Sequence, residues 1–158
     1  NLWIADTGNC RVVFKSGDGR REVLAASGVS AKSLCLSDQG DLVLGDFDRN
    51  RFFRVDDGTL TDLLEAYGIK HKFKALRGLL VTGEAVFIVD RDDDRVFKFS
   101  KTGACFAVTG GRGPEHGRFR HPVAVKKQDD TLYVVDRDND RVERYTLDLT
   151  YTGTLGGA

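Results

Sequence analysis

The stretch LYVVDRDNDRVERY, residues 132–145, sets the pattern for the whole chain. It consists of four apolar residues, an aspartate, four further residues, then an arginine and a second strand-like run. The aspartate recurs as Asp6, Asp46, Asp90 and Asp136, at successive spacings of 40, 44 and 46 residues. Such a period is typical of the blades of a β-propeller, each a four-stranded antiparallel sheet. The other three copies are LWIADTGNCRVVF (2–14), LVLGDFDRNRFFRV (42–55) and VFIVDRDDDRVFKF (86–99).

The turn residues between these copies divide the chain into one propeller segment, 1–158, of four repeats, approximately 1–30, 31–74, 75–120 and 121–158. The chain opens directly on the second strand of a blade, so we expect the first blade to lack its inner strand. Its outer strand is expected near residues 22–26, and a turn is expected at 56–58 in the second repeat. The predicted fold is therefore all-β, a partial propeller of four-stranded antiparallel blades.

Two local patterns bear on this prediction. Four successive apolar residues precede each repeated aspartate, which indicates a strand buried on both faces and favours a propeller over a sandwich. Residues 60–67, LTDLLEAY, also suit a short helix by their apolar spacing, but the repeat favours an outer strand there, and we predict a strand.

Composition limits the classes of function. Of 158 residues, 41% are apolar and 30% charged, which is globular, and 24 basic residues balance 24 acidic ones, so no net field attracts nucleic acid. No apolar run approaches the roughly 18 residues of a membrane span, so no membrane association is expected. The sequence contains no methionine, and we expect it to be a segment of a longer protein.

Cysteine usage and glycosylation signals suggest the compartment. Cys10, Cys35 and Cys105 form an odd set without a C-x-x-C motif, so we expect buried free thiols. Asn-x-Ser/Thr sequons are absent from the sequence, which agrees with an intracellular, cytoplasmic location.

The repeat unit resembles the NHL repeat, whose pattern is roughly Gly-x-Phe-x-x-Pro, an inner strand, Gly-Asn-Leu-Tyr-Val-Ala-Asp, then x-x-Asn-x-Arg-Val and an aromatic residue. The best matches are NLWIADTGNCR (1–11) and GRFRHP (117–122) followed by the opening stretch. The resemblance implies a propeller best known with six blades, whereas about 3.6 repeats are present. We therefore expect further blades in cis, or self-association, to cover the open apolar ends. The position of the signature histidine is occupied by Cys10, Asn50, Asp94 and Asp140.

Each repeated aspartate is followed five residues later by an arginine. We predict that each pair forms a charge-assisted hydrogen bond that closes the loop between the second and third strands, a structural role. The pairs are Asp6 with Arg11, Asp46 with Arg51, Asp90 with Arg95, and Asp136 with Arg141.

The loops from Asp90 and Asp136 place carboxylates at alternate residues, as a calcium-binding EF-hand loop does. Their sixth residue is Arg95 or Arg141 where such a loop needs glycine, and the bidentate glutamate at the twelfth residue is missing. We predict no metal site and no cofactor.

Basic residues concentrate in the links that enter the third and fourth repeats, on the face that also carries the acidic loops. The resemblance adds that several TRIM-NHL proteins bind single-stranded RNA through such a face, where cations neutralise phosphates. Phe73 and Phe119, in the same links, are expected to pack between blades instead of stacking on bases. The predicted binding residues are Lys70, Lys72, Lys74, Arg77, Arg112, His116, Arg118, Arg120 and His121.

Catalysis has little support from the residues. Neither a Ser-His-Asp arrangement nor a Gly-rich phosphate loop is indicated. His121 is expected near the mouth of the central channel, where similar lyases and lactonases hold metals, but no second ligand repeats at that position. We predict a non-catalytic scaffold that presents the loops to a protein partner. The alternatives are a single-stranded RNA-binding module and, third, a metal-dependent lyase or hydrolase.

Overall fold

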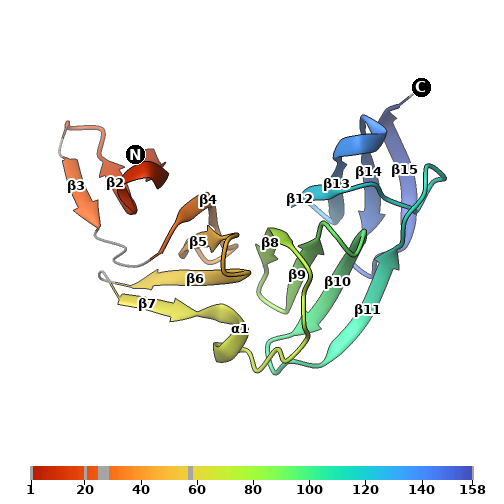
Figure 1. Ribbon diagram of the computed structural model, residues 1–158, viewed down its shortest axis with the longest axis horizontal. Coiled ribbons are helices and arrows are strands. Elements are labelled where there is room, and N and C mark those ends of the chain that lie inside the picture. The colour runs from red at the N-terminus through yellow and green to blue at the C-terminus, as the bar shows by residue number, and fades with distance from the viewer. Residues whose placement is uncertain (1, 20, 25–28, 57–58, 158) are drawn as a thin grey trace. The chain divides into compact units, whose positions relative to one another are not determined.

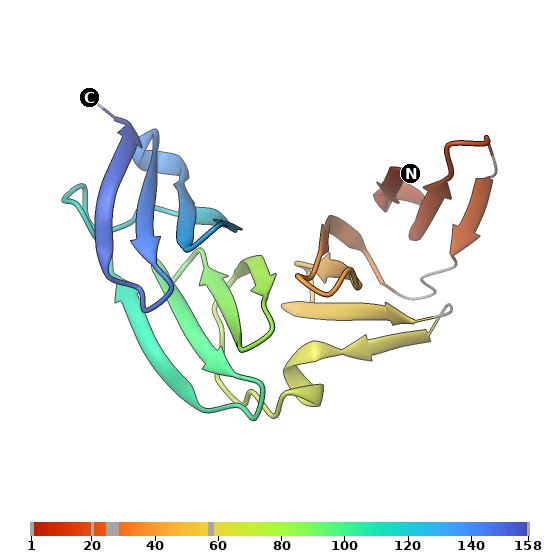
Figure 2. The same ribbon diagram turned by 180° about the vertical axis from the view of Figure 1, so that it is seen from behind.

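The computed structural model describes residues 2–19, 21–24, 29–56 and 59–157 (Figures 1 and 2). These residues form four antiparallel sheets whose strands follow one another in chain order, each pairing with the next. We call the sheets blades one to four. The chain divides into two compact units, Asn1–Ala66 and Tyr67–Ala158, which are described separately.

The first unit contains blades one and two. Blade one has three described strands, and a single 3-10 turn, η1 (Thr7–Asn9), joins its first two. Blade two has four strands and ends in a short helix. The elements are β1 (Leu2–Asp6), β2 (Arg11–Lys15), β3 (Arg21–Leu24), β4 (Ala31–Leu36), β5 (Leu42–Asp46), β6 (Arg51–Asp56), β7 (Thr59–Asp62) and α1 (Leu63–Ala66).

The second unit contains blades three and four, each with four strands. A 3-10 turn, η2 (Arg137–Asn139), occupies the same place in blade four as η1 does in blade one. The elements are β8 (Leu76–Val81), β9 (Ala85–Asp90), β10 (Arg95–Ser100), β11 (Cys105–Gly110), β12 (Pro122–Gln128), β13 (Thr131–Asp136), β14 (Arg141–Thr146) and β15 (Tyr151–Gly156).

The repeat closes in the same way in all four blades. The repeated aspartate and arginine are directly opposite each other in the strand ladder, as Asp136 and Arg141 are in blade four. The residue before each arginine has a left-handed backbone, with φ between 49° and 53°. Asparagine and aspartate tolerate this conformation better than most residues, and three of the four positions carry one of them. These positions are Cys10, Asn50, Asp94 and Asp140.

Each unit has its own core. In the second unit, β12 packs against β8 and β9, and the buried side chains of the two blades meet around Phe87, Phe119, Leu132 and Tyr145. In the first unit, a smaller cluster forms around Val12, Val29, Ala31, Leu42 and Leu44. Apolar burial is the main favourable term in folding, so each core stabilises the blades that contribute to it.

The prediction of burial on both faces is confirmed for β5 and β9, whose residues are all buried. It is wrong for β1 and β13. In β13, Leu132 and Val134 are buried in the core with blade three, while Val135, on the opposite face, is 36% exposed. Continuous apolar sequence therefore does not by itself bury both faces of a strand, because the second face also needs a packing neighbour.

The prediction of a strand across residues 60–67 is wrong from Leu63 onward, where α1 begins. The Asp62 carboxylate accepts the N–H groups of Leu64 at 2.9 Å and Glu65 at 3.3 Å, which satisfies donors that the start of a helix leaves free. Leu63 and Leu64 are both buried by the turn. A short helix therefore forms where a continued strand was predicted, because Asp62 caps its start and because it buries Leu63 and Leu64.

Two further expectations concern the cysteines and two short ranges at strand ends and turns. The three cysteines form no disulfide among the described residues, but the expected burial is wrong, since Cys10 and Cys105 are exposed and Cys35 is intermediate. The expected strand residues 25–26 and turn residues 57–58 lie outside the described residues. Within the described ranges, helices are too short or too polar to cross a membrane.

Candidate functional site

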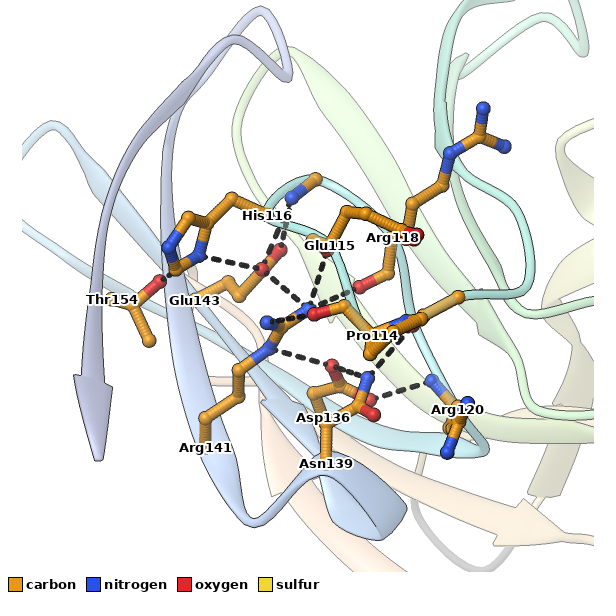
Figure 3. A network of polar contacts seen from close by, with 12 residues as sticks. Pro114, Glu115, His116, Arg118, Arg120, Asp136, Asn139, Arg141, Glu143 and Thr154 are labelled. Carbon is orange, nitrogen blue, oxygen red and sulfur yellow. Dashed lines mark hydrogen bonds and ion pairs between the residues drawn. The ribbon is translucent and has the colours of Figure 1, made fainter. Parts of the chain in front are cut away.

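A buried arginine organises the loop face of blade four (Figure 3). Arg141 Nε donates to Asp136 Oδ2 at 3.0 Å, and its side chain is 6% exposed while that of Asp136 is fully buried. The two Nη groups donate to three backbone carbonyls, those of Pro114, Glu115 and Arg118, at 2.7–2.8 Å. The guanidinium therefore ties β14 to the link between blades three and four, residues 111–121, which we call the arginine link.

Glu143 completes this network from the same strand. Its carboxylate is fully buried, lies 2.9 Å from Arg141 Nη2, and accepts the Gly117 N–H at 3.1 Å and the Tyr145 hydroxyl at 2.5 Å. Burial of the Tyr145 phenol, reinforced by its hydrogen bond to Glu143, raises the pKa of that hydroxyl above its ordinary value. Charges buried in this way are tolerated because each is paired and hydrogen-bonded.

Glu143 was not among the residues predicted from the sequence. Two residues after the repeated arginine, the other three copies carry apolar residues, Val13, Phe53 and Phe97. Glu143 could have been found from the sequence because it is a charged residue at a repeat position that is apolar in the other three copies.

Other hydrogen bonds hold the arginine link in place. Asn139 Nδ2 donates to the Gly113 carbonyl at 3.0 Å, and the Arg120 N–H donates to Asp136 Oδ1 at 2.7 Å. Phe119 is fully buried in the core of the second unit, which confirms its predicted packing role. The backbone of the link is anchored, while the side chains of Arg112, Arg118 and Arg120 are exposed.

The link that enters blade three, residues 67–75, is held in a related way. Asp90 accepts the N–H groups of Lys74 at 2.7 Å and Ala75 at 2.8 Å. Phe73 is partly buried, with its ring centre 5.7 Å from that of Phe97, and His71 lies 4.6 Å from the same ring. Phe73 therefore packs on strand β10 of blade three.

The predicted side-chain pairs form in two of the four repeats. Arg11 contacts Asp6 at 2.6 Å, and Arg141 contacts Asp136 as described above. The other two pairs were predicted wrongly. In the second repeat, Asp46 contacts Arg49 instead, and Arg51 contacts Asp62 at 3.0 Å. In the third repeat, Asp90 accepts backbone N–H groups, and Arg95 contacts Asp93 at 2.7 Å. Each charged side chain therefore bonds to the nearest suitable group, which in these two repeats is not its predicted partner.

The nine predicted binding residues divide into two sets. Four are engaged within the chain. Lys74 contacts Asp93, Arg77 donates to the Leu76 carbonyl, His116 lies 3.2 Å from the Thr154 hydroxyl, and His121 lies 2.5 Å from Asp138. The other five are exposed and form no ion pair within the described part of the chain: Lys70, Lys72, Arg112, Arg118 and Arg120.

Carboxylates of the acidic loops beside these cations form ion pairs within the chain. Arg137 and His121 both contact Asp138, and together they lower the pKa of that carboxyl. Arg91 forms a forked contact with Asp92 and lowers its pKa in the same way. No group of three or more His, Cys, Asp or Glu side chains within the described ranges is arranged to hold a metal ion.

A hollow of about 270 Å³ lies over this network, lined by Pro114, His116, Asn139, Arg141, Thr154 and the end of β15. It does not offer a free cation from Arg141, because the Nε and both Nη groups of that side chain already donate to acceptors in the chain. The exposed cations of the two links are therefore the more available feature of this face.

Comparison with known proteins identifies the fold. No family model matches the chain, and no curated protein sequence matches it. Among solved structures, a virginiamycin B lyase from Staphylococcus aureus is similar over 97% of this chain and 50% of its own, with 16% identity and a TM-score of 0.68. A chain of the nidogen/laminin complex (19% identity, TM-score 0.72) is similar over 97% of this chain and 58% of its own.

A gluconolactonase from Xanthomonas campestris, with 18% identity and a TM-score of 0.71, is similar over 98% of this chain and 57% of its own. The chain thus spans about half the length of these structures. At such identities the likeness concerns the fold alone. Together with the four successive antiparallel sheets, it shows that this chain has the fold of a β-propeller segment.

Proposed function

We propose that the chain is a non-catalytic binding module of NHL type that engages a protein partner through the loop face of its second unit. This face consists of residues 67–75, the arginine link, and the loops 91–94 and 137–140. The observation that carries the proposal is the set of five exposed cations that form no ion pair with any other described residue. Three of them stand on a link whose backbone is held by Arg141, Asp136 and Glu143. A preorganised surface loses little conformational entropy on binding.

The distribution of charge favours a protein over a nucleic acid. Carboxylates such as Asp92 and Asp138 alternate with the cations, so the face carries both signs. Protein interfaces use such mosaics for specificity, whereas binding to a phosphate backbone gains from uniformly positive surfaces. A chain of the nidogen/laminin complex shares this fold, which agrees with the proposal, although one fold serves many functions.

Single-stranded RNA is the second candidate ligand. It is favoured by the clustering of Arg112, Arg118 and Arg120 on one link, where their guanidinium groups are exposed. For the third reading, a metal-dependent lyase or hydrolase, the donor set is unfavourable. The ring of His121 lies against Asp138, and no third ligand-type side chain joins the two within the described ranges.

The test uses two labelled probes of similar length and charge, a deca-glutamate peptide and a ten-nucleotide single-stranded RNA, with affinity measured by fluorescence anisotropy. We expect the peptide to bind more tightly, and the double variant Arg118→Ala/Arg120→Ala to weaken it at least tenfold. The matched control is Lys15→Ala/Lys126→Ala, which removes two exposed cations that are not among the residues of this face. Peptide binding that is unchanged by the arginine variant would overturn the proposal. Tighter RNA binding that the same variant abolishes would support the second candidate instead.

A further inference from the structure

We propose that the free edge of β11 binds an extended segment of a partner protein by strand addition, and that this segment has acidic residues followed by apolar residues at alternate positions. The acidic part of this inference rests on the proposed function, because those residues would contact the arginine link. The apolar part rests on β11 alone. We call the side of β11 that faces away from β10 the β11 edge.

The β11 edge has backbone groups available for pairing. The strand order of blade three is β11-β10-β9-β8, so β11 has a neighbour on one side, and no described strand pairs with the other. Its six residues, CFAVTG, include neither a charged residue nor a proline, two of the devices by which proteins prevent pairing at an exposed edge, and the register shift in its ladder with β10 is confined to Phe106. Outer strands of the other four-stranded blades differ, since β7 runs into α1 and β15 carries Gly153 with its backbone at φ 156°.

The side chains of β11 present an apolar surface beside this edge. Val108 is directly opposite Phe97 in the ladder, so both lie on the same face of the blade, and Phe106 is the extra residue where the ladder with β10 shifts register. Phe97 belongs to the aromatic cluster that also contains His71 and Phe73. Phe106 is 64% exposed and Val108 47% exposed. A strand added at this edge would place every second side chain on the face that carries Val108.

The arginine link continues directly from the end of β11. The strand ends at Gly110, and a Cβ atom placed on Gly111 would lie only 2.6 Å from Arg118 Nη1, so this guanidinium lies over the start of the link. Antiparallel pairing is the commoner arrangement of strands. In that direction, the N-terminal end of the added segment lies beside Gly110 and Arg118, where acidic residues meet an exposed guanidinium group. Charge complementarity therefore specifies the order, acidic first and apolar after.

The probe is a labelled peptide with two glutamates followed by alternating valine and threonine. We expect saturable binding that Phe106→Lys and Val108→Lys each weaken at least tenfold, because a charge at the edge opposes pairing. Leu155→Lys, on the exposed part of β15, is the matched control and leaves affinity unchanged. Backbone N-methylation gives a readout specific to strand pairing: methylating one alternate set of residues abolishes binding, while methylating the other set preserves it.

Equal effects of the two methylated peptides, or full affinity in Val108→Lys, would overturn the inference. Unfolding curves of each variant confirm that loss of binding is not loss of fold. The deca-glutamate probe separates the two proposals. If Arg118→Ala/Arg120→Ala weakens deca-glutamate but the alternating peptide does not bind, strand addition fails and the proposed function stands. If Val108→Lys weakens binding of the alternating peptide while Arg118→Ala/Arg120→Ala leaves the affinity for deca-glutamate unchanged, the proposed function is refuted and the β11 edge site is supported.

Discussion

Glu143 Oε1 lies 2.9 Å from Arg141 Nη2, and both side chains are buried in blade four. This pair connects a strand of the blade to the link that carries three exposed arginines. The link is therefore an extension of the folded blade, and its conformation depends on charges that other repeats do not have at the Glu143 position.

Replacing Glu143 with alanine should strongly destabilise the second unit. The change leaves Arg141 without one of its two carboxylates, and the Gly117 N–H and Tyr145 hydroxyl without their acceptor. Breaking a buried ion pair by removing one partner costs about 3–5 kcal/mol. Urea denaturation should show this loss in the free energy of unfolding. Glu84→Ala, at an exposed position, should change it by no more than about 0.5 kcal/mol.

Arg141→Lys should be costly although the charge is kept. Lysine cannot reproduce the planar fork that serves Asp136 and the carbonyls of Pro114, Glu115 and Arg118, so we expect a loss of roughly 2–3 kcal/mol. The same substitution at Arg11, whose pair with Asp6 is partly exposed, should cost less than about 1 kcal/mol. Equal losses at the two sites, measured by denaturation, would contradict the central role of Arg141.

Gly78→Ala should disturb the contact between blades three and four. A Cβ atom at Gly78 would lie 2.9 Å from Val89 Cγ2 and 3.1 Å from Ala124 Cα, so β8 and β12 would have to separate. Overpacking of this kind costs about 1–3 kcal/mol. The matched control is Gly83→Ala, because a Cβ atom there meets nothing within 4 Å. A neutral Gly78→Ala in thermal or urea unfolding would show that the two strands adjust freely.

The carboxyl of Asp138 should titrate below its ordinary pKa of 3.8, because hydrogen bonds from Arg137 and then His121 favour its ionised form. Since the folded-state pKa is depressed, this interaction stabilises the fold above the unfolded-state pKa, and the stabilisation is lost as pH falls through the folded-state value. An NMR titration of the Asp138 carboxyl carbon measures the midpoint directly. Arg137→Ala should raise it, and Lys126→Ala should leave it unchanged. A midpoint insensitive to Arg137 would refute this assignment.

The sequence alone determined the repeat and the blade that it builds. Four copies of one pattern predicted successive antiparallel sheets, because hydrogen bonding between adjacent strands and the turns that join them are short-range properties. The register of Asp136 against Arg141 follows directly from that repeat. The packing of Phe119 in the core of the second unit was predicted from the resemblance to the NHL repeat.

Tertiary structure alone decided how the charged groups are used. Arg51 bonds Asp62 and Arg95 bonds Asp93, although their repeat positions match that of Arg141. The carbonyls that Arg141 binds, such as that of Pro114, lie more than twenty residues away in the chain. An ion or hydrogen-bond donor pairs with whichever acceptor the packed chain brings within about 3 Å, and a local sequence pattern does not contain that information.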